Sequence, residues 1–344
     1  METDVQSNEP LNRGIAAASA TTASDTRRAT TSRLREAIGD YSLVLIFVLM
    51  FAGMSIGVDH FFSIENMLGL ALSVSQIGMV ACTMMFCLAA RDFDLSVGST
   101  VAFAGVLCAM VLNATGSSVI AIGVAVAAGG MIGFVNGTVI AYLRINPLIT
   151  TLATMEIVRG LAFIVSHGQA VGVSSDAFMA LGNLSLFGIS MPIWVTLMCF
   201  VVFGVMLNNT VYGRNTLAIG GNPEASRLAG IRVERVRVTI FLVQGAVTAL
   251  AGVILASRIT SGQPNAGEGF ELNVISACVL GGVSLLGGRA SISGVVVGVL
   301  IMGTVENVMN LLSIDAFYQY LVRGAILLAA VLLDQLKNRG ERGS

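Results

Sequence analysis

Apolar runs recur along most of the chain, and they constrain its fold more than any other feature. A helix that crosses the hydrocarbon core of a bilayer needs about 20 mainly apolar residues. Ten runs approach this length: 41–58, 67–90, 95–113, 119–143, 147–166, 191–207, 238–257, 271–288, 291–312 and 316–333. Only 11% of the 344 residues are charged, which is well below the usual share in soluble domains. We therefore predict an all-α polytopic membrane protein with about ten transmembrane helices.

The basic residues are distributed unevenly among the segments that join these runs. If the N-terminus is cytoplasmic, 16 of the 19 Lys and Arg residues lie on the cytoplasmic side. Because cytoplasmic loops of membrane proteins carry an excess of Lys and Arg, both termini are predicted to be cytoplasmic. Residues 1–40 lack an apolar core, which predicts a disordered tail without a cleaved signal peptide. Residues 41–333 then form the transmembrane domain, and 334–344 form a second cytoplasmic tail.

A polar, Gly-rich segment at 213–231 interrupts the apolar pattern and carries the signals of a short helix. Asn222 suits the N-cap, Pro223 the first helical position, and Gly230 the residue that ends the helix. These signals predict a helix of about two turns over 223–229. Its small apolar face suits docking on another protein, and a helix lying on lipid headgroups is the alternative.

Charged residues stand at positions that allow them to pair. Three pairs are expected: Glu224 with Arg227, Glu156 with Arg159, and Glu306 with Arg323. The first lies in the polar helix, where a spacing of three residues places both side chains on one face. The other two lie within apolar runs, where an unpaired charge is costly. For these two, structural charge pairing and a role in gating or solute contact are both open.

Small residues at regular spacing predict close contacts between helices. Gly129, Gly133 and Gly137 recur every four residues in one run, and Gly294 and Gly298 repeat the spacing in another. In membranes such glycines let two helix backbones approach closely. The alternative is that they line a path for a bulky solute.

The chain lacks the residues that an ATPase or another enzyme needs. A nucleotide-binding P-loop contains a lysine in the pattern GxxxxGK[ST], and the single lysine, Lys337, stands in DQLKNRG. The two histidines, His60 and His167, stand near expected loops without the pattern of a catalytic or metal site. The five cysteines lie in apolar runs and suit buried apolar positions. We therefore predict no enzyme activity, no metal, no cofactor on this chain and no nucleic-acid partner.

Four sequence blocks carry a resemblance to a known family. They are RNTLAIGGNPEASRLAGI in the polar segment, FDLSVGS at 93–99, INPLITTLATMEIVRGLAFIVSHGQAVG at 145–172, and the long block at 270–312 that begins FELNVISACVLGGVSLLGG. Their order and spacing resemble those of the type-2 binding-protein-dependent permeases. These are the membrane subunits of ABC importers for ribose, arabinose, xylose and galactose. The resemblance extends over 41–333.

The resemblance implies a location, partners and a mechanism. The chain would lie in the bacterial inner membrane as a multi-pass permease, where two copies form a path for a monosaccharide. A cytoplasmic ATPase, which binds the ATP and Mg²⁺, would dock on the coupling segment 213–231, and an extracytoplasmic binding protein would deliver the sugar. The coupling residues implied in this way are Gly220, Gly221, Asn222, Glu224, Arg227 and Gly230.

A path for a sugar should present uncharged hydrogen-bonding groups of limited affinity. Candidates within the apolar runs are Gln76, Thr150, Thr151, Thr154, Asn273, Asn307 and Asn310. The alternative is that these side chains bond between helices and never contact the solute. Aromatic residues make up only 6% of the chain. This favours a path of low affinity, with sugar discrimination left to the binding protein.

The substrate and the energy source each have alternatives. LITTLATMEIVRGLAFIVS and TLAIGGNPEASRLAG resemble the arabinose branch of the family, which implies L-arabinose. Ribose, xylose and galactose permeases share all four blocks and are the nearest alternatives. An ion-coupled secondary transporter is the more remote one, because it is expected to use carboxylates or broken helices in the membrane as ion sites. The polar coupling segment favours an ATP-driven importer.

Overall fold

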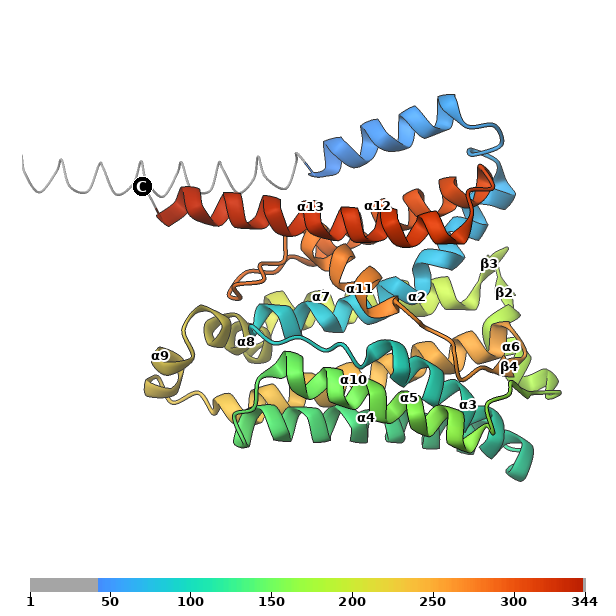
Figure 1. Cartoon of the computed structure of the whole chain (residues 1–344), viewed down its shortest axis with the longest axis horizontal. Helices are drawn as coiled ribbons and strands as arrows, with labels where there is room; N and C mark the ends of the chain where they lie inside the picture. Colours follow the sequence, from blue (N-terminus) through green and yellow to red (C-terminus); the bar gives the residue numbers. More distant parts are fainter. Residues whose placement is uncertain (1–42, 343–344) are drawn as a thin grey trace, which may run out of the picture. The chain divides into compact units, whose positions relative to one another are not determined.

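The computed structural model describes residues 43–342, and the expected tail at 1–40 lies outside them. The chain separates into two compact units, 1–48 and 49–344, and every labelled element belongs to the second. Its helices are α2 (Ile64–Ala89), α3 (Val97–Thr115), α4 (Ser118–Tyr142), α5 (Pro147–Val165), α6 (Asp176–Asn183), α7 (Met191–Asn209), α8 (Val211–Gly221), α9 (Pro223–Leu228), α10 (Val233–Arg258), α11 (Phe270–Leu280), α12 (Ile292–Leu311) and α13 (Ala316–Arg342). Figure 1 shows their arrangement.

The described part of the chain also contains two pairs of very short strands. β1 (Val171–Gly172) pairs antiparallel with β4 (Ser261–Gly262), which joins the segment after α5 to the segment after α10. β2 (Ser185–Leu186) and β3 (Ile189–Ser190) form a tight hairpin before α7. The predicted all-α membrane fold is therefore confirmed, with strands confined to the connections.

Seven of the described helices are long and apolar enough to cross a membrane, namely α2, α3, α4, α5, α7, α10 and α12. The expected count of ten is not confirmed, since the other three runs give shorter apolar helices at Leu43–Gly57, Phe270–Leu280 and Phe317–Leu332. The run 271–288 is wrong as a single span. Its helix ends at Leu280, and a loop with left-handed glycines, including Gly282 at φ +81°, follows. α13 in turn continues as helix to Arg342, beyond the expected end at 333.

Helix α2 forms the centre of the core. Its C-terminal half, from Ile77 to Ala89, is buried without interruption, and α2 packs against α7, α10, α11 and α12. Four of the five cysteines are buried and Cys199 is partly buried, and all five are free thiols. The interpretation of the cysteines as apolar core residues is confirmed.

The glycine pattern in α4 forms the largest helix contact, the one with α10. A side chain at Gly133 would overlap the carbonyl oxygen of Phe241, and a side chain at Gly245 would overlap that of Gly129. Gly294 and Gly298 make the same kind of contact with α11. The prediction of packing faces is confirmed, because backbone from the neighbouring helix fills the space that a side chain would need.

A short connection, residues 90–96, joins α2 to α3 through the interior of the unit (Figure 1). Asp92 and Asp94 in this segment are almost completely buried. The N-cap of α3 is Ser96, and Asp94 accepts hydrogen bonds from the Ser96 backbone N–H at 2.9 Å and from the Ser96 hydroxyl at 2.6 Å.

Candidate functional site

Helix α9 lies in the middle of the predicted coupling segment, and its first turn is capped as its sequence indicates. The Asn222 side-chain oxygen accepts hydrogen bonds from the backbone N–H groups of Glu224 at 3.0 Å and Ala225 at 3.1 Å. Pro223 fills the first helical position, where the N–H that it lacks is not needed. The cap therefore satisfies two donors that would otherwise have no partner in the chain.

The end of α9 depends on Gly230, whose φ of +84° suits a residue without a side chain. The N–H of Gly230 donates to the carbonyl of Arg227, and the N–H of Ile231 donates to that of Ser226, both at 3.0 Å. The helix covers Pro223–Leu228, one residue shorter than expected. Leu228 is 90% exposed, so an apolar side chain projects from this capped turn.

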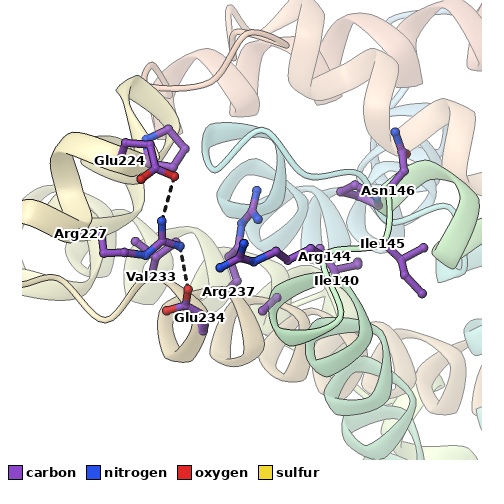
Figure 2. A pocket seen from close by; sticks show the side chains of 12 residues that line it. Ile140, Arg144, Ile145, Asn146, Glu224, Arg227, Val233, Glu234 and Arg237 are labelled. Atoms are coloured by element: carbon purple, nitrogen blue, oxygen red, sulfur yellow. Dashed lines mark hydrogen bonds and ion pairs between the residues drawn. The ribbon is translucent and has the colours of Figure 1, made fainter.

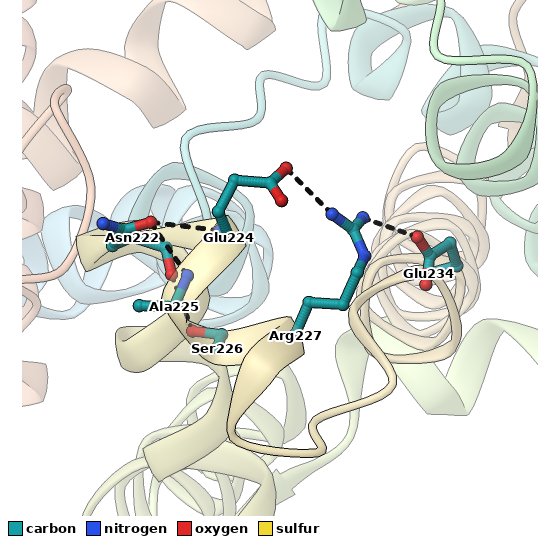
Figure 3. A network of polar contacts seen from close by, with 6 residues as sticks. All are labelled: Asn222, Glu224, Ala225, Ser226, Arg227 and Glu234. Carbon is teal, nitrogen blue, oxygen red and sulfur yellow. Dashed lines mark hydrogen bonds and ion pairs between the residues drawn. The ribbon is translucent and has the colours of Figure 1, made fainter.

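Arg227 links α9 to the first turn of α10, as Figure 3 shows. Its guanidinium contacts Glu224 at 2.9 Å, which confirms the expected pair, and Glu234 at 2.7 Å. Hydrogen bonds to Glu234 first, and to Glu224 second, raise the pKa of Arg227 above its ordinary value. No pattern in the sequence indicated Glu234 as a second partner. The additional contact fixes α9 relative to α10.

The end of α8 is held in a narrow space between two other segments. A side chain at Gly220 would overlap the carbonyl oxygen of Ala89 and lie close to the N–H of Gly288. That N–H donates to the same Ala89 carbonyl at 2.9 Å. Gly221, in contrast, has open space where a Cβ would stand. The Arg91 guanidinium donates to the Gly221 carbonyl at 2.9 Å, which attaches the α8–α9 junction to the start of the segment 90–96.

A cavity of about 280 Å³ lies between α9, the turn joining α4 to α5, and the start of α10. Figure 2 shows the side chains of Arg144, Arg227 and Arg237 on its lining. Arg144 occupies the left-handed region with φ +56°, an uncommon conformation for a residue with a side chain. The cavity belongs to the coupling segment, because α9 forms one of its walls.

Arg237 lines this cavity, and its guanidinium contacts the buried carboxylate of Asp92 at 3.0 Å. Asp92 is 0% exposed, and its burial raises its pKa to about 7, although the Arg237 charge acts in the opposite direction. No pattern in the sequence indicated that Arg237 or Asp92 belongs to the site. Burial of a carboxylate is costly unless a partner of opposite charge stands next to it.

The intramembrane pairs have different outcomes. Glu306 and Arg323 form an ion pair at 3.1 Å, and Asn273 donates to the same carboxylate oxygen at 2.8 Å, which confirms the expected pair. Glu156 and Arg159 form no ion pair in the described structure, so that expectation is wrong. Arg159 donates instead to backbone carbonyls of the loop before α11, at 2.8 and 2.6 Å. The Arg159 side chain is long enough to reach those carbonyls. The Glu156 side chain, in contrast, is exposed.

A second cavity, of about 180 Å³, lies among α2, α3, α10, α11 and α13. Of the seven candidate path residues, Gln76 and Asn273 line it, together with Glu268 and Arg323. The Gln76 amide nitrogen, the Asn273 amide oxygen and the Arg323 Nε are buried without a hydrogen-bond partner among the described residues. The cavity is therefore lined by polar and charged side chains, three of which carry a buried polar atom without a partner.

The other five candidates bond within the protein. Thr150 and Thr151 donate to carbonyls one turn earlier, at Asn146 and Pro147. Thr154 donates to Asn136 of α4 at 2.6 Å. Asn307 exchanges hydrogen bonds with Asn66, and Asn310 accepts one from Gln319. The contacts of Thr154, Asn307 and Asn310 favour the alternative in which such residues join helices, whereas Thr150 and Thr151 bond within the first turns of α5.

A polytopic helical domain that holds a capped, charged helix firmly against the ends of its spans has the form of a membrane transport subunit. The chain belongs to the family described as "Branched-chain amino acid transport system / permease component", whose model matches residues 66–331. The resemblance found in the sequence blocks is therefore confirmed.

Relatives resemble the chain over most of its length. It is 56% identical to the L-arabinose transport system permease protein AraH of Escherichia coli (strain K12), over 88% of this chain and 92% of that one. It is 55% identical to the L-arabinose ABC transporter permease protein AraH of Azospirillum brasilense, over 87% and 88%. Identity to the ribose import permease protein RbsC of Bacillus subtilis (strain 168) is 41%, over 79% and 85%. No solved structure matches the chain.

Proposed function

We propose that this chain is the permease subunit of an ATP-driven importer for L-arabinose in the bacterial inner membrane. The observation that carries the proposal is the 56% identity to an L-arabinose permease over 88% of the chain. The ribose permeases are less similar, at 41% or below among those compared. A ribose importer remains the second candidate, because these relatives also cover most of the chain.

The partner that supplies energy is an ATPase subunit on the cytoplasmic side, which binds the ATP and Mg²⁺. Support comes from the α8–α9 junction, where an exposed Leu228 projects from a helix that is capped at both ends. Arg227 attaches α9 to α10, and Gly220 packs the end of α8 against Ala89. We therefore expect the capped helix to move as a rigid body when the ATPase changes conformation. Nucleotide binding can then favour one arrangement of the spans over another, as any conformational switch requires.

The second partner is another copy of this chain. Glu156 lies near the middle of α5, a helix long and apolar enough to span the membrane, and its side chain is exposed in the single chain. A carboxylate exposed to lipid at that depth is costly. We infer that a second copy faces this side of α5, so that Glu156 borders the contact between copies or an aqueous path between them.

The solute is a monosaccharide delivered by an extracytoplasmic binding protein. The second cavity supports this part of the proposal, because the polar side chains of Gln76 and Asn273 line it and each has a buried hydrogen-bonding atom without a partner. An unpartnered buried polar group costs free energy until a water or a solute hydroxyl satisfies it. Such a site binds a sugar weakly enough to release it again.

Uptake into vesicles tests the substrate and the energy source together. The permease is reconstituted with its ATPase and binding protein, and ATP is enclosed on the ATPase side. Accumulation of labelled L-arabinose should require ATP, stop with vanadate and continue with a protonophore. An excess of unlabelled L-arabinose should compete, whereas ribose should not. Uptake of labelled ribose without uptake of labelled L-arabinose would identify the second candidate, and loss of uptake with the protonophore but not with vanadate would contradict ATP coupling.

A further inference from the structure

Three polar contacts connect the coupling segment with the interior in a closed ring. Arg227 joins α9 to α10 through Glu234 at 2.7 Å. Arg237, three residues further along α10, joins that helix to Asp92 at 3.0 Å. Arg91, next to Asp92, returns to the α8–α9 junction through the Gly221 carbonyl at 2.9 Å. We call these the coupling ring.

Asp92 is the most constrained member of the ring. Its side chain is fully buried, and within residues 43–342 its one ion-pair partner is Arg237. Among the described residues, no further hydrogen bond reaches either carboxylate oxygen. A buried charge with one partner is strongly disfavoured if that partner moves away. Asp92 and Arg237 must therefore move together.

The segment 90–96 leads from Asp92 directly into the spans. Ser96, the N-cap of α3, accepts a hydrogen bond from the Asn136 amide of α4 at 3.1 Å. The Asn136 oxygen in turn accepts the Thr154 hydroxyl of α5 at 2.6 Å. A displacement of Asp92 thus reaches three spans through one short connecting segment. α5 is also the helix that carries the exposed Glu156.

We propose that Asp92 and Arg237 form a positioning pair that transmits movement of α9 through the segment 90–96 to α3, α4 and α5. This inference rests on the proposed function and names the residues through which the ATPase acts on the spans. The pair contacts neither ATP nor sugar. Its effect is on the number of sugar molecules transported for each ATP hydrolysed.

That ratio is measured in the reconstituted complex for wild type and for D92N/R237Q, which removes both charges together. The ratio should fall about fivefold or more, while ATP hydrolysis continues. About fivefold is the factor at the lower end of typical coupling between two sites. A purely structural pair would lower the amount of assembled complex and leave the ratio unchanged, because inactive protein contributes to neither measurement. R235Q is the matched control, since Arg235 lies two residues away and is exposed. Its ratio should equal that of wild type.

A second variant keeps the test decisive if D92N/R237Q fails to assemble. Arg91 is exposed, so R91Q removes the third contact of the ring without burying an unpaired charge. It should lower the ratio as well, by a smaller factor. A wild-type ratio in R91Q and in any D92N/R237Q complex that assembles overturns the inference alone. Wild-type vesicles that show no ATP-driven uptake overturn the proposed function, and this inference with it.

Discussion

Gly220 lies directly against the carbonyl oxygen of Ala89, the last residue of α2, so no side chain fits at position 220. The contact joins the end of α8 to the most buried helix of the core. It also explains why two consecutive glycines have different roles. Glycine is required at position 220 because no side chain fits there. Gly221 has open space where a Cβ would stand, and its carbonyl accepts a hydrogen bond from Arg91.

Replacing Gly220 with Ala should therefore destabilise the protein by about 1–3 kcal/mol, because backbone occupies the space of the added methyl group. G221A should be neutral within about 0.5 kcal/mol, as is usual for a substitution in open space. Thermal unfolding of the detergent-purified permease measures both. Equal stability of G220A and G221A would contradict the close contact.

Removing the cap of α9 should loosen the coupling segment. N222A eliminates both side-chain hydrogen bonds to Glu224 and Ala225, a loss of about 1 kcal/mol at an N-cap. N222D keeps an acceptor in place and serves as the control. Hydrogen exchange of the α9 amides should accelerate in N222A and stay near the wild-type rate in N222D. Unchanged exchange in N222A would show that the cap does not hold the helix.

Separating the intramembrane pair should be strongly destabilising. R323M leaves Glu306 without its cation, and removal of one partner from a buried pair costs about 3–5 kcal/mol. The double variant E306Q/R323M removes both charges and should recover most of this loss. The measurement is thermal unfolding in detergent. If the double variant were no more stable than R323M, the pair would not be the cause of the loss.

Asp92 should make folding stability depend on pH. Its pKa is about 7 in the folded protein against an ordinary value of 3.8, so the folded state retains a proton that the unfolded chain releases. Stability should therefore fall as pH rises between these two values. Arg237 of α10 faces Asp92, and Asp94 and Cys87 are the neighbouring titratable groups. The melting temperature of wild type should fall relative to D92N between about pH 4 and about pH 7, and a constant difference would contradict the assignment.

The contact between copies can be tested at Glu156. If a second copy faces this side of α5, E156C should be joined to its counterpart by a short thiol-reactive crosslinker in native membranes. The wild-type chain is the control for the native thiols, four of which are buried. Dimeric product should form in E156C only. Monomer alone under conditions that support transport would argue against this interface.

The sequence predicted the parts of the fold that depend on local pattern. The length of the apolar runs located the long spans to within a few residues, with α10 starting five residues early. The cap of α9 followed from Asn222, Pro223 and Gly230, because capping chemistry involves residues close together in the chain. The spacing of Gly133 and its neighbours identified the α4 contact face, although not its partner α10.

The failures have a common physical cause, which is contact between residues far apart in the chain. Arg159 had a suitable neighbour in Glu156, but its guanidinium donates hydrogen bonds to carbonyls more than 100 positions away in the chain. Asp92 and Arg237 are 145 positions apart, and neither stands in a pattern that indicates burial. The run 271–288 was apolar enough for a span, but hydropathy does not distinguish a helix from a partly buried glycine-rich loop. Only the tertiary structure shows which of the two forms a segment takes.

Vesicles that contain this chain with and without its partners test the central claim most directly, namely that a separate ATPase drives the permease through α9. Labelled L-arabinose should accumulate above its outside concentration only when the ATPase, ATP and the binding protein are all present. Uphill accumulation by the permease alone, without nucleotide, would contradict the account.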